Sequence, residues 1–414
     1  MRSRTTLIWR WLIHLPRVLI ALILAQATLM ASLFAYAKIR KRAVENIFAE
    51  LEIPPLLIDK HTVHVFDDGG SVFREMLHDI ESARESILLE TYIFERDEVG
   101  MAFKRALIRK AREGVRVYVI FDGIGTLHVP ARFKSFGRRR NIRVFEFGRL
   151  RSLRSYFDVK MWVRDHRKIL VVDGKIGYLG GMNIGRAYAW TWRDTHLKIT
   201  GPMAGNIARE FIDLWNEHNS RRPIILPYER TNDEYIGVCG NDPFRNELPI
   251  RQTYLDAINK AERNIYITNA YFLPDSGIVQ ALIAARQRGV DVQIMFPEIS
   301  DNIVVDWIAR GIATDLLRGG VRILQYCGTM LHSKTMTIDS EWSTVGSANL
   351  DGRSLTANYE INATIIDAAF ARQMEAIYLN DRAQSREAAV DKWVRRNPLQ
   401  RAAELSLRPL RGLF

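Results

Sequence analysis

The chain has 414 residues, 47% of them hydrophobic, and this length and composition predict two domains with packed cores. Its net charge of +12 predicts an anionic partner, although charge alone does not decide between lipid headgroups and nucleic acid. Cys239 and Cys327 are the only cysteines, and their wide separation argues against a disulfide framework or a metal-binding pair and predicts free, buried thiols.

An uncharged stretch near the N-terminus predicts a membrane anchor. Residues 18–37 contain no charged side chain, and as a helix they would span roughly 30 Å, the thickness of a bilayer core. The alternatives are a buried soluble helix and a signal peptide cleaved near residue 37, but the stretch exceeds the usual apolar core of a signal peptide. We therefore predict a retained anchor over residues 1–42. Basic residues flank the stretch on both sides, so its orientation in the membrane stays open.

From about residue 60 onward the chain contains two similar series of strands and helices. Each series predicts a strand, a helix and a second strand, at 86–94, 99–113 and 115–122 and again at 264–273, 277–288 and 290–296. The segment 219–236 is rich in proline and polar residues and predicts a linker. We therefore expect an α/β fold with two domains, at 60–218 and 237–390, each a mixed, largely parallel sheet flanked by helices.

A segment before the middle of the chain mixes basic and aromatic residues and has no counterpart in the second series. The chain takes 19 residues from Phe147 to His166, but only 6 from the equivalent Tyr326 to His332. Such a mixture suits contact with anionic headgroups, and a solvated loop is the alternative. The tail at 391–414 has similar character and predicts a membrane-lying segment, with a frayed terminus as its alternative. The expected headgroup contacts in the insertion are Arg149, Arg151 and Arg154.

Both series contain the same polar residues at the same spacing. Each has a His, a Lys two residues later, an Asp five residues after the Lys, an Asn 17 residues after the His and a carboxylate 28 residues after it. Alternation along a strand puts the His and Lys on one face before an apolar run, and Asp173-Gly174 predicts a hairpin turn. A single histidine at a strand end is most often structural, but two copies in register indicate a duplicated reactive site. The residues are His166, Lys168, Asp173, Asn183 and Asp194 in the first copy and His332, Lys334, Asp339, Asn349 and Glu360 in the second.

These residues resemble the phospholipase D superfamily, whose signature is HxKxxxxD followed by GxxN. The second part reads Gly-Gly-Met-Asn at 180–183 and Gly-Ser-Ala-Asn at 346–349. Within the superfamily the chain is most similar to the bacterial cardiolipin synthases, through LETYIF (89–94), NAYFLP (269–274) and VGSANLDGRS (345–354), while hydrolytic phospholipases share much of this. The resemblance covers nearly the whole chain after residue 63 and implies two tandem phospholipase D-like domains. Together with the uncharged stretch, this predicts two such domains behind an N-terminal transmembrane helix.

The residue types suit the cleavage of an anionic phosphodiester. The two lysines can neutralise the phosphate, and Asn183 and Asn349 can donate amide hydrogens to its oxygens. One imidazole can attack phosphorus and form a phosphohistidine, while the other protonates the leaving alkoxide and then deprotonates the acceptor. This division requires both histidines to face one phosphate, so the strand ends of the two domains must pack together. Asp194 and Glu360 can hold the rings through their second nitrogens.

The resemblance implies a role for each copy. In this superfamily the first histidine is the nucleophile, here His166, and the second is the acid and base, here His332. The Asp of each signature, here Asp173 and Asp339, is structural, and no metal or cofactor is required. The chain departs from strict symmetry because its first copy ends on an aspartate and its second on a glutamate, which fits unequal roles for the two histidines.

We therefore expect a membrane-bound phosphatidyltransferase of the cardiolipin synthase type at the inner membrane of a bacterium. It would move a phosphatidyl group from phosphatidylglycerol or phosphatidylethanolamine to His166, and then to phosphatidylglycerol to form cardiolipin. Its partners would be phosphatidylglycerol, cardiolipin and the membrane, and not nucleic acid. The alternatives are a hydrolytic phospholipase D, a phospholipase D-like nuclease and a non-enzymatic lipid-binding module, which has no use for the paired residues. The oligomeric state and the balance between transfer and hydrolysis stay open.

Overall fold

The computed structural model describes residues 51–137, 140–149 and 162–395, together with a few further positions (Thr28, Arg401, Glu404, Ser406, Leu407 and Arg411). The anchor predicted over residues 1–42, with the exception of Thr28, and most of the basic insertion lie outside this part of the chain. Among the residues described, none of the helices combines the length and the hydrophobicity that a bilayer span requires.

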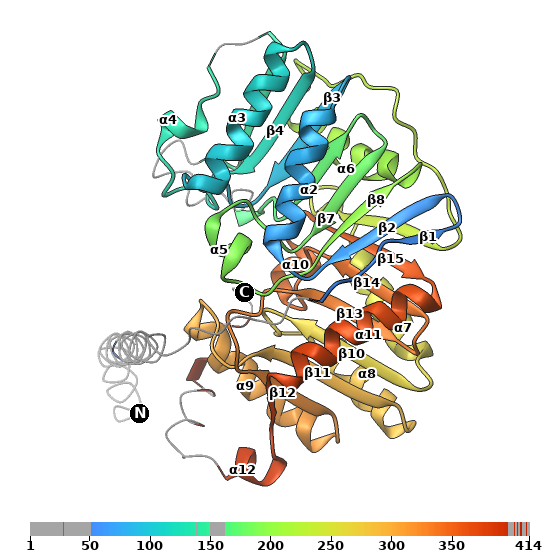
Figure 1. Ribbon diagram of the computed structural model, residues 1–414. Coiled ribbons are helices and arrows are strands. Elements are labelled where there is room, and N and C mark those ends of the chain that lie inside the picture. Colours follow the sequence, from blue (N-terminus) through green and yellow to red (C-terminus); the bar gives the residue numbers. More distant parts are fainter. Residues whose placement is uncertain are drawn as a thin grey trace, which may run out of the picture.

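The described chain forms two eight-stranded sheets, one from each half of the sequence, and Figure 1 shows the first sheet above the second. In spatial order the first sheet contains β1 (Leu56–Ile58), β2 (His61–Phe66), β8 (His196–Thr200), β7 (Ile176–Gly180), β6 (Ile169–Val172), β3 (Ser86–Thr91), β4 (Arg116–Asp122) and β5 (Ile142–Phe147). The second contains β16 (Ser385–Glu387), β12 (Arg322–Tyr326), β11 (Asp291–Pro297), β10 (Asn264–Asn269), β13 (Lys334–Ile338), β14 (Trp342–Gly346), β15 (Glu360–Ile366) and β9 (Ile236–Asn241).

The two sheets repeat one arrangement of seven strands. The order β2-β8-β7-β6-β3-β4-β5 in the first sheet corresponds to β9-β15-β14-β13-β10-β11-β12 in the second, while β1 and β16 each add an edge strand. The tandem duplication inferred from the polar residues is therefore present in the fold. The strand of the signature motif, β6 or β13, lies near the middle of each sheet, where its neighbours fix it on both sides.

The sheets are mixed, as expected, but the expectation that they are largely parallel is wrong. Only the β3-β4-β5 and β10-β11-β12 pairs run parallel. The remaining five pairs of each sheet are antiparallel. The signature strand returns through a tight hairpin, β6–β7 or β13–β14, and the next strand reverses once more, so this side of each sheet must be antiparallel.

Helices cover both faces of each sheet, as the cores show. On the first sheet α2 and α3 pack against one face and α6 against the other. On the second sheet α7, α8 and α9 cover one face and α11 the other. The helices are α2 (Gly69–Ser82), α3 (Glu98–Arg112), α4 (Ala131–Lys134), α5 (Arg186–Trp190), α6 (Met203–His218), α7 (Pro249–Lys260), α8 (Ser276–Gln287), α9 (Ile303–Arg318), α10 (Gly352–Thr356), α11 (Ala368–Ala383) and α12 (Val390–Val394).

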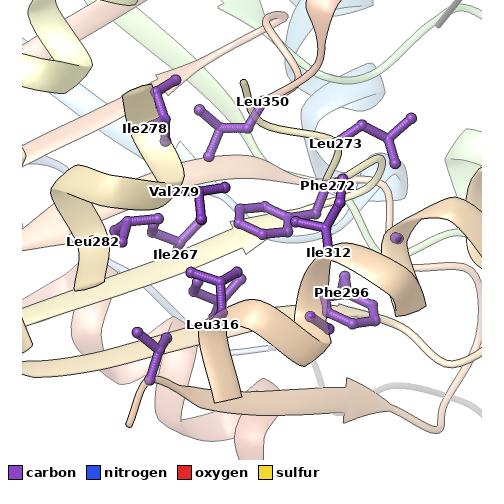
Figure 2. Close-up of a cluster of buried hydrophobic side chains, with 14 of the residues drawn as sticks. Ile267, Phe272, Leu273, Ile278, Val279, Leu282, Phe296, Ile312, Leu316 and Leu350 are labelled. Atoms are coloured by element: carbon purple, nitrogen blue, oxygen red, sulfur yellow. The ribbon is translucent and has the colours of Figure 1, made fainter. Parts of the chain in front are cut away.

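One hydrophobic core is continuous across the two halves. It joins Val171 and Phe211 of the first half to Ile361 and Phe370 of the second, all fully buried. A second core belongs to the C-terminal half alone, and Figure 2 shows its centre, where the ring of Phe272 lies among the side chains of β10, α8 and α9. The shared core holds the halves together as one body, which the proposed chemistry requires.

The linker is fixed along α6. Residues 219–235 contain no helix or strand, as expected for a linker. The amide of Ile224 donates to Asn216 Oδ1 (2.7 Å), and the amide of Thr231 donates to Asn206 Oδ1 (2.8 Å). These contacts hold the linker against α6 along its path from the end of α6 to the start of β9.

The described positions of the C-terminal tail contradict part of the membrane-lying prediction. Leu407 is fully buried in the core of the second half, and Glu404 lies over Gly311 of α9. The indole nitrogen of Trp393 lies 3.2 Å from the hydroxyl of Thr314 on the same helix. These residues cover an apolar face of α9 and so are unavailable to a bilayer.

Candidate active site

The two signature strands meet where their histidines lie. The amide of His166 donates to the carbonyl of Tyr359 (3.0 Å), and the amide of His332 donates to the carbonyl of Arg193 (2.6 Å). In both cases the acceptor is the residue directly before the candidate carboxylate of the opposite half. Short parallel bridges across the interface therefore set each histidine beside the other half's carboxylate.

The carboxylates are exchanged between the halves. His166 Nδ1 lies 2.9 Å from Glu360 Oε1, and His332 Nδ1 lies 2.6 Å from Asp194 Oδ2. Sequence spacing indicated that these carboxylates hold the rings but did not say which carboxylate holds which ring. Because each pair contains one residue from each half, neither half contains a complete site.

The two lysines lie buried beside the histidines. The ammonium of Lys168 donates to the carbonyl of His166 (2.5 Å), and that of Lys334 donates to the carbonyl of His332. Burial lowers the pKa of Lys168 to about 7 and that of Lys334 to about 8, although Glu360 and Asp194 oppose the change. An anion bound beside the two lysines would favour their charged form.

The two histidine–carboxylate pairs differ in their electrostatics. Burial and the nearby lysines hold the pKa of His166 well below its usual value, and burial raises the pKa of Glu360 to about 8. Burial also lowers the pKa of His332, but Asp194 opposes this change. Burial alone would raise the pKa of Asp194, yet His332 and Lys334 outweigh it and leave that pKa below its usual value. An ionised carboxylate therefore faces His332.

Both asparagines line the same pocket as the histidines. The side-chain oxygen of Asn183 accepts the amide of Ile93 (3.0 Å), which fixes the orientation of its NH₂ group. The side-chain oxygen of Asn349 is buried and has no hydrogen-bond partner among the described residues. Asn349 is nevertheless held by its neighbour, because the amide of Leu350 donates to Asn269 Oδ1 (3.2 Å).

The second residue of each GxxN turn contacts the carboxylate of its own half and differs with the length of that side chain, Asp194 in the first half and Glu360 in the second. A Cβ atom at Gly181 would lie 2.1 Å from Asp194 Oδ1, so only glycine fits beside this aspartate. The equivalent Ser347 instead donates its hydroxyl hydrogen to Glu360 and accepts the amide of Ile361 (3.0 Å). The two copies have therefore diverged in pairs, with glycine beside aspartate and serine beside glutamate.

A pocket of about 550 Å³ contains the two histidines and both asparagines. Its wall near His166 contains two arginines, Arg164 and Arg353, and the ring of Tyr92, 5.1 Å from that of His166. Arg164 pairs with the buried Asp122 (3.3 Å), and Asp351 lines the same pocket. Its wall near His332 is aromatic, with ring centres 5.2 to 6.2 Å away. Sequence analysis gave these wall residues no role, although several lie in the stretches that carry the family resemblance. The aromatic residues are Tyr188, Trp192 and Tyr271.

The Asp of each signature lies at the opposite end of the strand from the histidine. The carboxylate of Asp173 accepts the backbone amides of residues 84, 85 and 86 (2.8 to 2.9 Å). Asp339 accepts those of residues 262, 263 and 264 (2.7 to 2.9 Å). Asp173 and Gly174 both have positive φ (51° and 64°), as a type I′ hairpin turn requires. These contacts fit the structural role expected of both residues.

Two buried arginines, neither of which was predicted from the sequence, form ion pairs next to the residues of the site. Arg193 makes a two-bond ion pair with Asp381 of α11 (2.9 Å each) and so joins the halves. Arg167 donates to Glu90 (2.6 Å), and its guanidinium lies over the ring of Tyr359. The sequence offered one signal for these arginines: Arg167 directly follows His166, and Arg193 directly precedes Asp194.

The remaining predicted positions are less informative. Arg149 is exposed and lies 3.5 Å from Glu146, while Arg151 and Arg154 fall outside the described residues. Cys239 and Cys327 are free thiols, but they are partly rather than fully buried. Within the described ranges, no group of three or more His, Cys, Asp or Glu side chains could hold a metal ion.

Comparison with known proteins places this arrangement in a family. The family model described as cardiolipin synthase, PLD-like domain, matches residues 76–215 and 254–382. Cardiolipin synthase A of Pseudomonas entomophila (strain L48) is 35% identical over 339 residues, which cover 80% of this chain and 70% of that protein. Cardiolipin synthase of Clostridium perfringens (strain SM101 / Type A) is 33% identical over 367 residues, covering 84% and 76%.

Among solved structures, the phosphatidylserine synthase of Haemophilus influenzae Rd KW20 has a similar fold. The TM-score is 0.65 at 12% identity, over 91% of this chain and 96% of that chain. The similarity therefore extends over both sheets and supports the fold alone. From the family model and the two relatives, the chain belongs to the cardiolipin synthase family of phospholipase D-like proteins.

Proposed function

We propose that this chain is a cardiolipin synthase-type phosphatidyltransferase, which passes a phosphatidyl group through His166 onto phosphatidylglycerol. The observation that carries the proposal is the pair of histidines in one pocket, each bound at Nδ1 by a carboxylate of the opposite half. Because Nδ1 is engaged in both rings, Nε2 is the nitrogen available to a phosphate. The relatives named cardiolipin synthase support phosphatidylglycerol as the acceptor.

The unequal surroundings of the two histidines support their assignment. A nucleophile needs a free lone pair, and the lowered pKa of His166 keeps its ring neutral near neutral pH. A general acid must hold a proton. The ionised carboxylate of Asp194 stabilises the imidazolium form of His332 and so opposes the burial and the Lys334 charge that lower the pKa of this ring.

In the first step, His166 Nε2 attacks phosphorus and forms a phosphorus–nitrogen bond. The bond between phosphorus and the headgroup oxygen breaks, and His332 transfers its Nε2 proton to that oxygen, so glycerol leaves as a neutral alcohol when phosphatidylglycerol is the donor. Lys168, Lys334 and the two asparagines neutralise and orient the phosphate oxygens.

In the second step, a hydroxyl of phosphatidylglycerol attacks the phosphohistidine. His332, now neutral, accepts the hydroxyl proton, the phosphorus–nitrogen bond breaks and His166 is released with its lone pair. The product is cardiolipin, and both histidines return to their starting protonation states. No external cofactor enters this sequence of bond changes.

We place the enzyme at the inner membrane of a bacterium, with residues 1–42 as its anchor. The catalytic domains are 60–218 and 237–390, joined by the linker at 219–236. Anionic lipid is expected to meet the cationic insertion around Arg149, and the net charge of +12 supports such contacts. The donor is phosphatidylglycerol or phosphatidylethanolamine.

The test is product analysis with labelled phosphatidylglycerol in vesicles. Cardiolipin and glycerol in equal amounts support the proposal. Phosphatidic acid without cardiolipin would make the chain a hydrolytic phospholipase D, and cleavage of DNA with a steep salt dependence would make it a nuclease. A variant with both His166→Ala and His332→Ala serves as the inactive control.

A further inference from the structure

We propose that Asp301 and Tyr271 form a polyol-binding subsite beside His332, which selects the glycerol headgroup. This inference rests on the proposed function, because it names what the same pocket recognises. The subsite serves two groups in turn, the leaving headgroup of the donor and the attacking headgroup of the acceptor.

The direction of attack places both headgroups on the side of His332. In-line displacement at phosphorus puts the leaving oxygen opposite the attacking atom, here His166 Nε2. The acceptor then displaces His166 along the same line from the opposite side. Since His332 exchanges a proton with both oxygens, both headgroups must lie against the wall that contains His332.

That wall carries a carboxylate that the proposed chemistry does not use. Asp301 lines the pocket and accepts the hydroxyl hydrogen of Tyr271, whose ring centre lies 6.2 Å from that of His332. The second carboxylate oxygen of Asp301 has no hydrogen-bond partner within the described part of the chain, and the residue is exposed. The charge of Asp301 also acts on Lys334 and on Tyr188, another residue of this wall.

The chemistry of this wall fits a small polyol. A carboxylate accepts two hydrogen bonds from neighbouring hydroxyls, and bonds to a charged acceptor are the stronger kind. Trp192 and Tyr188 offer aromatic faces to the carbon atoms between those hydroxyls. The opposite wall contains the guanidinium groups of Arg164 and Arg353, which suit phosphate oxygens instead. The pocket therefore separates the phosphate end of a headgroup from its hydroxyl end.

The subsite is held by the packed core of the second half. Figure 2 shows Phe272, which follows Tyr271, against Phe296 of β11 and Ile312 of α9, and the two phenyl rings stack at 6.3 Å. Those contacts fix the segments on both sides of the subsite. Hydrogen bonds at the two residues that flank Asp301 then fix the loop that contains it.

In that loop the amide of Ser300 donates to Asp306 Oδ2 (3.0 Å), and Asn302 accepts the amides of the first turn of α9. Asp301 lies between these two fixed positions. Its backbone therefore has little freedom, and its side chain is directed by the bond from Tyr271. A recognition residue held in this way loses little entropy when it binds a headgroup.

The experiment offers three donors of equal acyl composition in one mixed micelle, namely phosphatidylglycerol, phosphatidylpropanol and phosphatidylethanolamine. Released glycerol, propanol and ethanolamine are counted in the same reaction. With the three donors at equal concentration and little of each consumed, their ratios equal the ratios of kcat/KM. They do not depend on the amount of folded enzyme or on whether lipid or water accepts the phosphatidyl group. Wild type is compared with Asp301→Ala, Asp301→Asn and Tyr271→Phe, and Asp315→Asn on the exposed side of α9 is the matched control.

The proposal expects Asp301→Ala to lower the ratio of glycerol to propanol roughly tenfold or more, the usual effect of losing a bond to a charged group. Asp301→Asn and Tyr271→Phe should lower it less, and Asp315→Asn should leave it unchanged. An unchanged ratio in both Asp301 variants overturns the subsite. A larger loss of ethanolamine than of glycerol release in Asp301→Asn also overturns it, in favour of an ammonium site.

The same reactions test the proposed function separately. If phosphatidic acid forms in place of cardiolipin while the glycerol ratio still falls in Asp301→Ala, transfer is wrong and the headgroup subsite stands. If cardiolipin forms but the ratio does not respond, the phosphatidyltransferase stands and the subsite is wrong.

Discussion

Two buried lysines decide how the site responds to pH at the scale of single residues. In the folded protein, burial lowers the pKa of Lys168 to about 7 and that of Lys334 to about 8. An empty site therefore loses positive charge as the pH rises through this range, whereas a bound phosphate stabilises the protonated lysines. We therefore expect the proposed binding of a phosphodiester to be coupled to proton uptake.

The first prediction follows from this coupling. The second-order constant kcat/KM should fall as the pH rises from about 7 through about 8, the pKa values of the two lysines in the empty site, while kcat, which reports the bound state, should fall only at higher pH. Profiles measured with a p-nitrophenyl phosphodiester of a lipid check this difference. Lys168→Arg provides a control, because arginine stays charged and should move the alkaline limb upward. A kcat/KM that rises steadily through this range would mean that charged lysines are not required.

The second prediction concerns the close fit of Gly181. Gly181→Ala puts a methyl group onto Asp194 and should displace it from His332. Loss of the acid and base should lower kcat for phosphatidylglycerol by about 10²–10⁴-fold. A p-nitrophenyl donor needs no acid, so its first step should be nearly unaffected. Ser347→Ala, which removes the hydrogen bonds of the hydroxyl to Glu360 and to the amide of Ile361 but adds no bulk, should cost only about tenfold. Equal losses in the two variants would contradict this account of the turns.

At the scale of elements, helices and strands could be predicted from local sequence patterns, but the pairing of strands could not. The expected helix at 99–113 is α3 (Glu98–Arg112), and the expected strand at 115–122 is β4 (Arg116–Asp122), because the residue patterns that predict a helix or a strand are local. The antiparallel side of each sheet was missed, since short apolar strands such as β7 and β8 carry no mark of direction. The motif residues were found because they repeat at fixed spacing, whereas Asp301 belongs to no repeat.

The third prediction belongs to the hairpins. Asp173→Ala removes three backbone hydrogen bonds at the end of β6 and should lower the free energy of unfolding by about 1–3 kcal/mol. Protein that remains folded should keep most of its kcat, because this carboxylate lies far from the pocket. Urea denaturation and specific activity of the same sample check both statements, and Asp339→Ala should behave alike. A variant that is stable but inactive would make Asp173 a catalytic residue.

At the scale of the whole molecule, the site exists only because the halves pack together. Each histidine takes its carboxylate from the other half, and the buried pair of Arg193 and Asp381 joins the halves directly behind His332. This exchange was not predictable from spacing, since both residues of each copy keep the same intervals whichever way the halves pair. In a chain with both halves, the pocket therefore contains two histidines with different surroundings, as the proposed division into nucleophile and acid requires.

The fourth prediction concerns the ion pair between Arg193 and Asp381, which joins the two halves. Asp381→Ala leaves a buried, unpaired arginine and should lower the free energy of unfolding by about 3–5 kcal/mol. Replacing both partners, with Arg193→Met and Asp381→Leu, removes the unpaired charge and should restore much of the loss. Urea denaturation of wild type, Asp381→Ala and the double variant measures the three free energies of unfolding. Equal stability of wild type and Asp381→Ala would mean that the pair does not hold the halves together.

The account depends most on the division of labour between the two histidines, and one trapping measurement tests it. In His332→Ala, a p-nitrophenyl donor still supplies a good leaving group, but the second step lacks its base. The phosphatidyl group should therefore accumulate on His166, where mass spectrometry of the digested protein would locate it, and His166→Ala should show no adduct. An adduct on His332 in His166→Ala would reverse the roles. If neither variant can be trapped and both keep more than about 10% of wild-type turnover, far above what loss of a catalytic group allows, phosphohistidine catalysis is wrong for this protein.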